Sequence, residues 1–309
     1  MDLQTLSSAG ISPVVMTSDE ILDAATRLVL KHTPGPGVFQ STVPGLTLYH
    51  ITSQTFIERS AGELLSTFII QGRKSTAIGG KVLEYGPGES LVSGIASPSE
   101  FHTLDSSPEH PFLAISVSLD LSILMEYAGM LDGTKHSEEV LGGVFVIRPD
   151  EDLAIAFLGL LRLLERPELI PIRAPLQIRE LHALLLDSSC GNQLRTLASA
   201  GSAGHSVLKA VNWIRKNYAS ACSVEELAER ANMSPATFYR KFRQVTGSSP
   251  VQFRKKVRLF EARRILLARE ANAASAAYKV GYESATQFTR DYKAAFGASP
   301  IKDIKRLAG

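Results

Sequence analysis

The C-terminal third of the chain contains an internal repeat, in which residues 223–250 match residues 273–300 at a constant offset of 50. Many matches in one register indicate two copies of one structural unit, because chance matches would not share an offset. The matched pairs are Ser234 with Ser284, Phe238 with Phe288, Arg240 with Arg290, Phe242 with Tyr292, Gly247 with Gly297, and Ser249-Pro250 with Ser299-Pro300.

Each copy of the repeat predicts a helix, a turn and a second helix. In the first copy, Ser223 and Glu226 form a capping box that begins a helix. Asn232-Met233 makes the turn, and Ser234 caps the second helix. Pro235 then occupies the first helical position, where the missing N–H group costs no hydrogen bond.

The second helix of each copy separates an apolar face from a polar one. Phe238, Phe242 and Val245 follow one another at i, i+4 and i+7, so we expect them to face a core. The residues expected to face outward are Ala236, Tyr239, Arg240 and Arg243 in the first copy, and Thr286, Thr289, Arg290 and Lys293 in the second.

A helix is also predicted between the two copies. Ser249 and Gln252 form another capping box, and the helix that it begins runs through Leu267. About 18 residues at about 1.5 Å each span about 27 Å. That length is comparable to the roughly 34 Å between successive major-groove faces on one side of a DNA duplex.

The charge of the chain is distributed unevenly. Residues 209–309 hold 20 Lys and Arg against 8 Asp and Glu, which is a balance of +12. The whole chain holds 33 and 31, so residues 1–208 keep 13 basic and 23 acidic residues, a balance of −10. This asymmetry is typical of a polyanion-binding module joined to a part that does not bind the polyanion.

The basic half is suited to double-stranded DNA. An exposed arginine on a second helix can form two hydrogen bonds to guanine in the major groove. Hydroxyl and N–H groups at helix starts can bind phosphates, with help from the helix dipole. The expected phosphate contacts are Ser234, Thr237, Lys241, Ser284, Thr289 and Lys293. The alternative to DNA binding is a small helical bundle whose surface helices carry basic residues without binding DNA.

The N-terminal half predicts an antiparallel sandwich or barrel, because short apolar runs alternate there with Gly, Pro and Ser. Two helices are expected after it, at Leu153–Glu165 and Pro175–Leu186, and a short one over Ile21–Leu30 before it. The apolar stripe Leu153–Leu164 would cover the barrel, form a dimer seam, or both. The expected strands are Leu46–Ile51, Leu64–Gln71, Thr76–Ile78, Val82–Tyr85, Ser90–Ile95 and Phe112–Val117.

The small residues of Ala198–Ser206 predict a flexible linker at the point where the charge changes sign. We therefore divide the chain into a barrel domain for effector binding and dimerisation at 1–200, a linker at 201–206 and a DNA-binding domain at 207–309.

The barrel shows no sign of catalysis. Its candidate metal ligands are too scattered, since the seven histidines of the chain include no His-x-His pair. No phosphate loop or nucleophile elbow is present either. We therefore expect no enzyme, no metal and no cofactor. A fused cupin-type enzyme is the least favoured alternative.

A barrel without a metal can still hold one small ligand. We expect it to bind a small-molecule effector whose identity the sequence does not give. The alternative is a barrel with a solid core that only dimerises. The candidate effector contacts are Tyr49, Phe68, Tyr85 and Phe101, with His50, Arg73 and Lys74 as polar anchors.

The C-terminal half resembles the AraC/XylS family of bacterial transcription regulators over residues 207–304. The resemblance rests on residues 224–243, 246–250, 280–290 and 296–300. It implies two helix-turn-helix motifs that read adjacent major grooves. We expect a homodimer that contacts RNA polymerase and acts as an activator, with a repressor as the open alternative. The base-facing positions that it implies are Ala236, Tyr239, Arg240, Thr286, Gln287 and Arg290.

The N-terminal half resembles the YqhC-like subgroup of the same family. The similar segments are Ile70–Lys74, Gly79-Gly80, Tyr85–Glu89 and Ser118–Leu121. The resemblance implies a cupin-like barrel followed by dimerising helices. The expected fold class is therefore an α+β cupin-like barrel with flanking helices, joined to an all-α domain with two helix-turn-helix motifs.

Three features predict a cytoplasmic protein that does not engage a membrane. The longest apolar run, Leu153–Leu161, ends at Arg162 and falls short of the 18 or so residues that span a bilayer. The start Met1-Asp2-Leu3 lacks the basic region of a signal peptide. The two cysteines, Cys190 and Cys222, form no disulfide framework.

Overall fold

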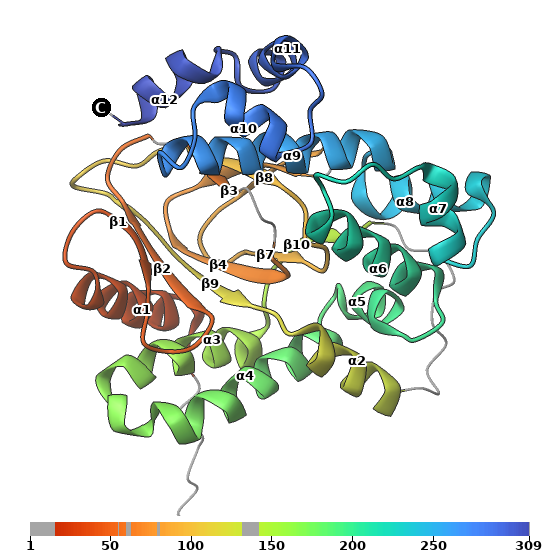
Figure 1. Ribbon diagram of the computed structural model, residues 1–309. Coiled ribbons are helices and arrows are strands. Elements are labelled where there is room, and N and C mark those ends of the chain that lie inside the picture. Colours follow the sequence, from red (N-terminus) through yellow and green to blue (C-terminus); the bar gives the residue numbers. More distant parts are fainter. Residues whose placement is uncertain (1–15, 55, 60–62, 79–80, 132–141, 309) are drawn as a thin grey trace, which may run out of the picture.

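A computed structural model describes residues 16–54, 56–59, 63–78, 81–131 and 142–308 (Figure 1). The start Met1-Asp2-Leu3 and the turn Gly79-Gly80 lie outside the described residues. Within the described ranges, no helix has the length and apolar character needed to cross a membrane.

The N-terminal half is built on two antiparallel sheets that enclose an apolar core. One sheet has the order β1-β2-β9-β4-β7-β10 and the other the order β3-β8-β5-β6. The first comprises β1 (Gly37–Gln40), β2 (Leu46–Ile51), β4 (Leu65–Gln71), β7 (Ser90–Ser93), β9 (Phe112–Ser118) and β10 (Val144–Ile147). The second comprises β3 (Phe56–Arg59), β5 (Lys74–Ile78), β6 (Lys81–Tyr85) and β8 (Ser99–Thr103).

Helices cover the outer face of the six-stranded sheet. Side chains alternate along β4, so Ile69 belongs to the core between the sheets while Phe68 points to the helices and stacks on Phe157 at 5.1 Å. These helices and short 3₁₀ turns are α1 (Ser18–His32), α2 (Leu121–Met130), α3 (Glu151–Arg162), η1 (Leu163–Glu165), η2 (Pro167–Leu169), α4 (Ile170–Asp187) and α5 (Gly191–Ala198).

The apolar stripe of α3 is buried by its own chain. Leu153, Phe157, Leu160 and Leu161 are at most 1% exposed and belong to one core with the sheet, α1 and α4. The prediction of a dimer seam on this stripe is therefore wrong, because covering the barrel buries all of the stripe except Leu164, which is partly buried against the same core.

The C-terminal half is entirely helical among its described residues, and its start and stop signals are those that the sequence predicts. Ser223 and Ser249 each form a capping box, and Ser234 accepts a hydrogen bond from the Thr237 N–H group. The helices are α6 (Ala203–Lys216), α7 (Val224–Arg230), α8 (Pro235–Thr246), α9 (Pro250–Leu267), α10 (Ala273–Lys279), α11 (Ala285–Phe296) and α12 (Pro300–Ala308).

The expected flexible linker is shorter than predicted. Ser202 caps α6, so residues 203–206 form the first turn of that helix and His205 is only 5% exposed. Four residues, 199–202, separate α5 from α6. The wider arrangement confirms the expected fold class, with a sheet-rich half and a helical half that contains the two motifs (Figure 1).

Candidate nucleic-acid interface

Two helix-turn-helix motifs stand at the ends of α9. The first consists of α7 and α8, and the second of α10 and α11. Aromatic side chains fix each second helix to α9: Phe242 of α8 packs edge-on against Phe253 at 5.6 Å, and Phe296 of α11 packs edge-on against Phe260 at 5.4 Å. Because these rings are buried, the opposite faces of α8 and α11 are presented outward.

The six expected base-facing residues all lie on those outward faces. Ala236, Tyr239 and Arg240 are exposed on α8, and Thr286, Gln287 and Arg290 are exposed on α11. Among the described residues, the guanidinium groups of Arg240 and Arg290 have no hydrogen-bond or ion-pair partner. Both groups are therefore free to bind an external acceptor from equivalent positions of the repeat.

Some of the expected phosphate contacts already form hydrogen bonds within the protein, and others differ in their exposure. Ser234 uses its hydroxyl to donate to Thr237 Oγ1 at 3.0 Å, and Thr289 donates to the Ala285 carbonyl at 2.8 Å. Ser284 accepts from the Gln287 N–H group at 3.4 Å. Lys293 is exposed on α11, whereas Lys241 is half-buried on α8.

Charged residues that sequence reasoning did not single out anchor α9 to its surroundings. Lys255 forms a 2.8 Å ion pair with Asp291 of α11, and Tyr282 donates a 3.4 Å hydrogen bond to the same carboxylate. Burial and the Asp291 charge raise the pKa of Tyr282, so its phenol stays protonated and can donate. Arg254 and Arg258 donate to carbonyls of residues 218–222. No local motif marks these contacts, since each joins residues far apart in the chain.

A buried ion pair supports the second motif. Arg263 of α9 lies 2.7 Å from Asp303 of α12, with side chains that are 4% and 0% exposed. Tyr292 donates to the same carboxylate at 2.9 Å, and Arg306 reaches it from the surface at 2.8 Å. Helices α9, α11 and α12 are thus joined at one carboxylate.

Four of the seven expected effector contacts meet inside the barrel. The Lys74 ammonium lies 4.4 Å from the ring centre of Phe101, 5.2 Å from that of Tyr85 and 6.0 Å from that of Tyr49. The Tyr85 hydroxyl is hydrogen-bonded to Thr76 at 2.9 Å. The cavity beside them is about 20 Å³, which is room for about one water molecule.

The other three expected contacts, Phe68, His50 and Arg73, do not face this interior. Phe68 packs on α3, and His50 Nδ1 is hydrogen-bonded to Thr33 at 2.9 Å on the helix side of the sheet. Partial burial there lowers the pKa of His50. Arg73 is exposed. Adjacent strand residues point to opposite faces, so Tyr49 and His50 could not both point inward. Arg73 precedes β5, which begins at Lys74.

The described residues contain no group of three or more His, Cys, Asp and Glu side chains that could hold a metal ion.

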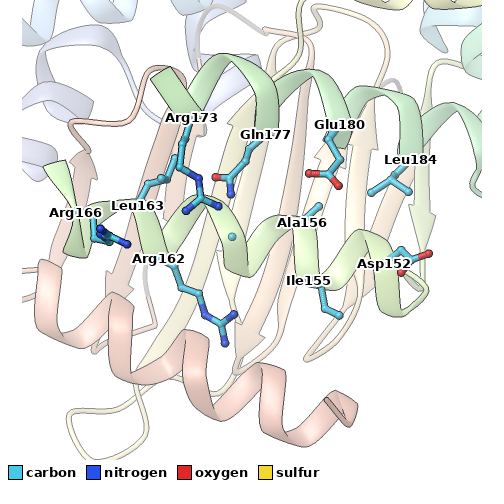
Figure 2. Close-up of a pocket in the computed structure, with 11 residues that line it drawn as sticks. Asp152, Ile155, Ala156, Arg162, Leu163, Arg166, Arg173, Gln177, Glu180 and Leu184 are labelled. Atoms are coloured by element: carbon cyan, nitrogen blue, oxygen red, sulfur yellow. The ribbon is translucent and has the colours of Figure 1, made fainter. Parts of the chain in front are cut away.

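A surface groove of about 630 Å³ runs between α3 and α4 (Figure 2). Figure 2 shows Arg162, Arg166 and Arg173 at one end of the groove and Asp152 and Glu180 at the other. Its ends therefore carry opposite charge.

Sequence comparison matches the two halves to different known sequence families. Residues 42–193 match the AraC-type transcriptional regulator N-terminus, and residues 227–306 match a helix-turn-helix domain. The YqhC-like subgroup is not distinguished by these matches and stays a prediction.

Curated relatives match only in part. The transcriptional activator RhaS of Pectobacterium carotovorum is 28% identical over 110 residues, which are 36% of this chain and 39% of that protein. RhaS of Escherichia coli is 29% identical over 94 residues, which are 30% of this chain and 34% of that protein. The matched part thus spans little more than a third of either relative.

The solved structure of ToxT from Vibrio cholerae has a similar fold over most of the chain. The TM-score is 0.54 at 9% sequence identity, with 85% of this chain and 98% of ToxT covered. ToxT bound to (E)-4-(8-methylnaphthalen-1-yl)but-3-enoic acid gives the same TM-score of 0.54. At this identity the similarity concerns the fold alone.

Proposed function

Because this chain belongs to the AraC family of transcriptional regulators, we propose that it binds specific sequences of double-stranded DNA and activates transcription through contact with RNA polymerase. It acts in the cytoplasm and has no catalytic activity of its own. The observation that carries the proposal is the repeat of one exposed, unengaged arginine, Arg240 and Arg290, on the second helix of both motifs.

The spacing of the two motifs supports binding across adjacent grooves. Helix α9 joins them and has 18 residues, so it is about 27 Å long. It contributes to the cores of both motifs and so sets the distance between them, with Phe253 buried in the first core and Phe260 in the second. A protein that presents two helices in this way reads sequence through base contacts and gains affinity through phosphates.

Base reading and phosphate contact can be separated with two variants of the same helix. We expect Arg290→Ala to weaken binding by about 1–3 kcal/mol and to relax the preference at one base position. Lys293→Ala should weaken binding to all sequences alike and reduce the salt dependence by about one unit of slope. Selection of duplexes from a random library, followed by binding titrations at several salt concentrations, measures both effects. Equal and sequence-independent losses from both variants would exclude base reading by Arg290.

We propose further that the protein forms a homodimer through α3 and α4. Ile172 and Leu176 lie one turn apart on α4 and are 68% and 64% exposed. Each directly precedes a residue that lines the groove, Arg173 and Gln177 respectively, and the two ends of this groove carry opposite charge. In a two-fold symmetric dimer the same surface of each copy forms the contact, and the two surfaces run in opposite directions. The arginine end of the groove in one copy would therefore meet the acidic end of the groove in the other.

Leu176→Asp is therefore expected to shift the protein from dimer to monomer at micromolar concentration in sedimentation experiments, because it places a charge in an apolar contact. Val82→Asp is the matched control, since Val82 is 70% exposed on the four-stranded sheet, away from α3 and α4. A dimer that survives Leu176→Asp, or dissociates equally with Val82→Asp, would place the interface elsewhere.

The barrel is proposed to sense a small molecule. Its support is the buried Lys74 ammonium among four aromatic rings, a setting that could receive an anionic group. The cavity of about 20 Å³ requires that side chains move to admit a ligand. The passive dimerisation barrel is the competing proposal, and the small cavity favours it.

Thermal unfolding with small carboxylic acids, including the compound bound to ToxT, decides between the two proposals. A ligand at 100 times its Kd stabilises the folded state by about 2.7 kcal/mol. We expect at least one acid to raise the Tm of the full chain and to lose that effect with Lys74→Met. If no compound in the set shifts the Tm, the passive barrel is the better account.

A further inference from the structure

The connection between β7 and β8 contacts two different parts of the molecule. Ser93, Ser97 and Ser99 line the barrel cavity. Ile95 and Ala96, between them, are 1% exposed and belong to the apolar cluster that contains the core of the first helix-turn-helix motif. Ser93 Oγ donates to the Ile95 carbonyl at 2.7 Å, which ties the two faces of the segment together.

A narrow cleft continues this contact between the barrel and the end of α8. Ile95, Ile78 and Val144 line it from the barrel, and Val245 and Thr246 line it from α8. Ile78 also borders the barrel cavity. Ile95 and Val245 belong to the same apolar cluster, so a displacement of the cavity wall would be transmitted through that cluster to the second helix of the first motif, because packed interiors transmit strain.

The second motif has its own core of buried residues. Tyr218 packs against this core and against that of the first motif, and the described members of the second cluster include no residue earlier in the chain. Helix α9 contributes residues to both cores. Phe253 and Val257 belong to the first core, and its buried apolar residues from Leu259 to Leu266 belong to the second. The charge of Lys256, in the part of α9 that belongs to the first core, opposes the rise that burial causes in the pKa of Glu100 on β8.

We infer that the state of the barrel reaches the first helix-turn-helix motif through residues 93–99, and that the second motif is insulated from it. The regulatory role of this coupling rests on the proposed function. An effector would change how the first motif binds its half of the DNA site and would leave the binding of the second motif to the other half unchanged. The coupling itself is a property of the free chain. Ile95 is a positioning residue in this scheme and touches neither DNA nor ligand.

Removal of one methyl group tests the coupling in the full chain without ligand or DNA. Ile95→Val is compared with Ile70→Val, a matched control because Ile70 is also buried in the barrel, 3% exposed, but packs toward the outer helices. Hydrogen–deuterium exchange is followed by mass spectrometry. We expect Ile95→Val to speed exchange over residues 203–246 by about two- to tenfold, as the loss of one buried methyl implies, with no change over residues 273–308.

Three outcomes would overturn the inference: an equal rise in both motifs, no rise over residues 203–246, or the same rise with Ile70→Val. The reverse change gives a second measurement, since coupling is reciprocal. Val245→Ala should speed exchange over residues 93–99, and unchanged exchange there would also contradict the coupling. Binding to library-selected duplexes is measured separately on the same proteins. Asymmetric exchange without binding to any duplex would refute only the proposed function, whereas binding with symmetric exchange would refute only the coupling.

Discussion

Asp303→Asn is expected to lower the free energy of unfolding of the second motif by about 3–5 kcal/mol, because it leaves a buried charge without its partner. Arg263 is 4% exposed and lies 2.7 Å from the Asp303 carboxylate. The asparagine has nearly the same shape and retains an acceptor for Tyr292, so the loss reports the missing charge rather than a cavity. Urea unfolding followed by circular dichroism measures it.

Arg306→Ala is the matched control for Asp303→Asn. Arg306 contacts the same carboxylate at 2.8 Å, but its side chain is 60% exposed. Solvent screens such a pair, so its removal is expected to cost no more than about 1 kcal/mol. If the two variants lowered the free energy of unfolding equally, the burial of Arg263 would not explain the loss of stability in Asp303→Asn. A combined Arg263→Met and Asp303→Leu variant should recover much of the stability, since an apolar pair needs no compensation.

The helical half could be predicted closely from the sequence because its signals are local. Capping boxes at Ser223 and Ser249 set the starts of α7 and α9. The internal repeat adds to this, because the pattern of one motif supports the prediction of the other. Gly247 and Gly297 end α8 and α11 with φ of +70° and +74°, the left-handed conformation that glycine adopts without strain. The charge network around Asp303 could not be predicted, since a buried carboxylate has no local signature.

The strands were harder to predict because β4 and β9 are buried on both faces. Leu65 to Ile70 are all buried, so their apolar pattern carries no period of two to show which residues face the barrel interior. That is why Phe68 was grouped with Tyr49. The sequence pattern does not reveal the short strands β1, β3, β8 and β10, because four or five residues give little periodicity and tertiary contacts decide their structure. It does not reveal the helices α2 and α5 either, although they have 10 and 8 residues.

Lys74 shows a second limit. A charged pair beside a turn is usually solvated, and Arg73 follows that expectation. Lys74 is instead 5% exposed, and its ammonium lies among the rings of four aromatic residues from different strands. The sequence contains these rings but does not show that they converge, because their meeting depends on the register of the two sheets.

Gly281→Ala is expected to destabilise the second motif by about 2–5 kcal/mol and to abolish binding at its half of the DNA site. Gly281 makes the turn before α11 with φ of +87°, and a Cβ there would lie 2.2 Å from the carbonyl oxygen of Ala219. The left-handed conformation alone costs an alanine about 1–2 kcal/mol, and forced overlap typically adds about 1–3 kcal/mol. Urea unfolding and titration with library-selected duplexes measure the two effects.

The first motif offers the matched control for this change. Asn232 occupies its turn with φ of +53° and is exposed. Asn232→Ala therefore carries the conformational cost of about 1–2 kcal/mol without any overlap, and it should leave both halves of the DNA site occupied. The difference between the variants isolates the close approach of α10 and α11 to the loop after α6, where Arg258 also donates to the Ala219 carbonyl at 3.2 Å. If Gly281→Ala proved no worse than Asn232→Ala, the loop would have to yield without cost, and contact with Ala219 would not be what fixes the second recognition helix.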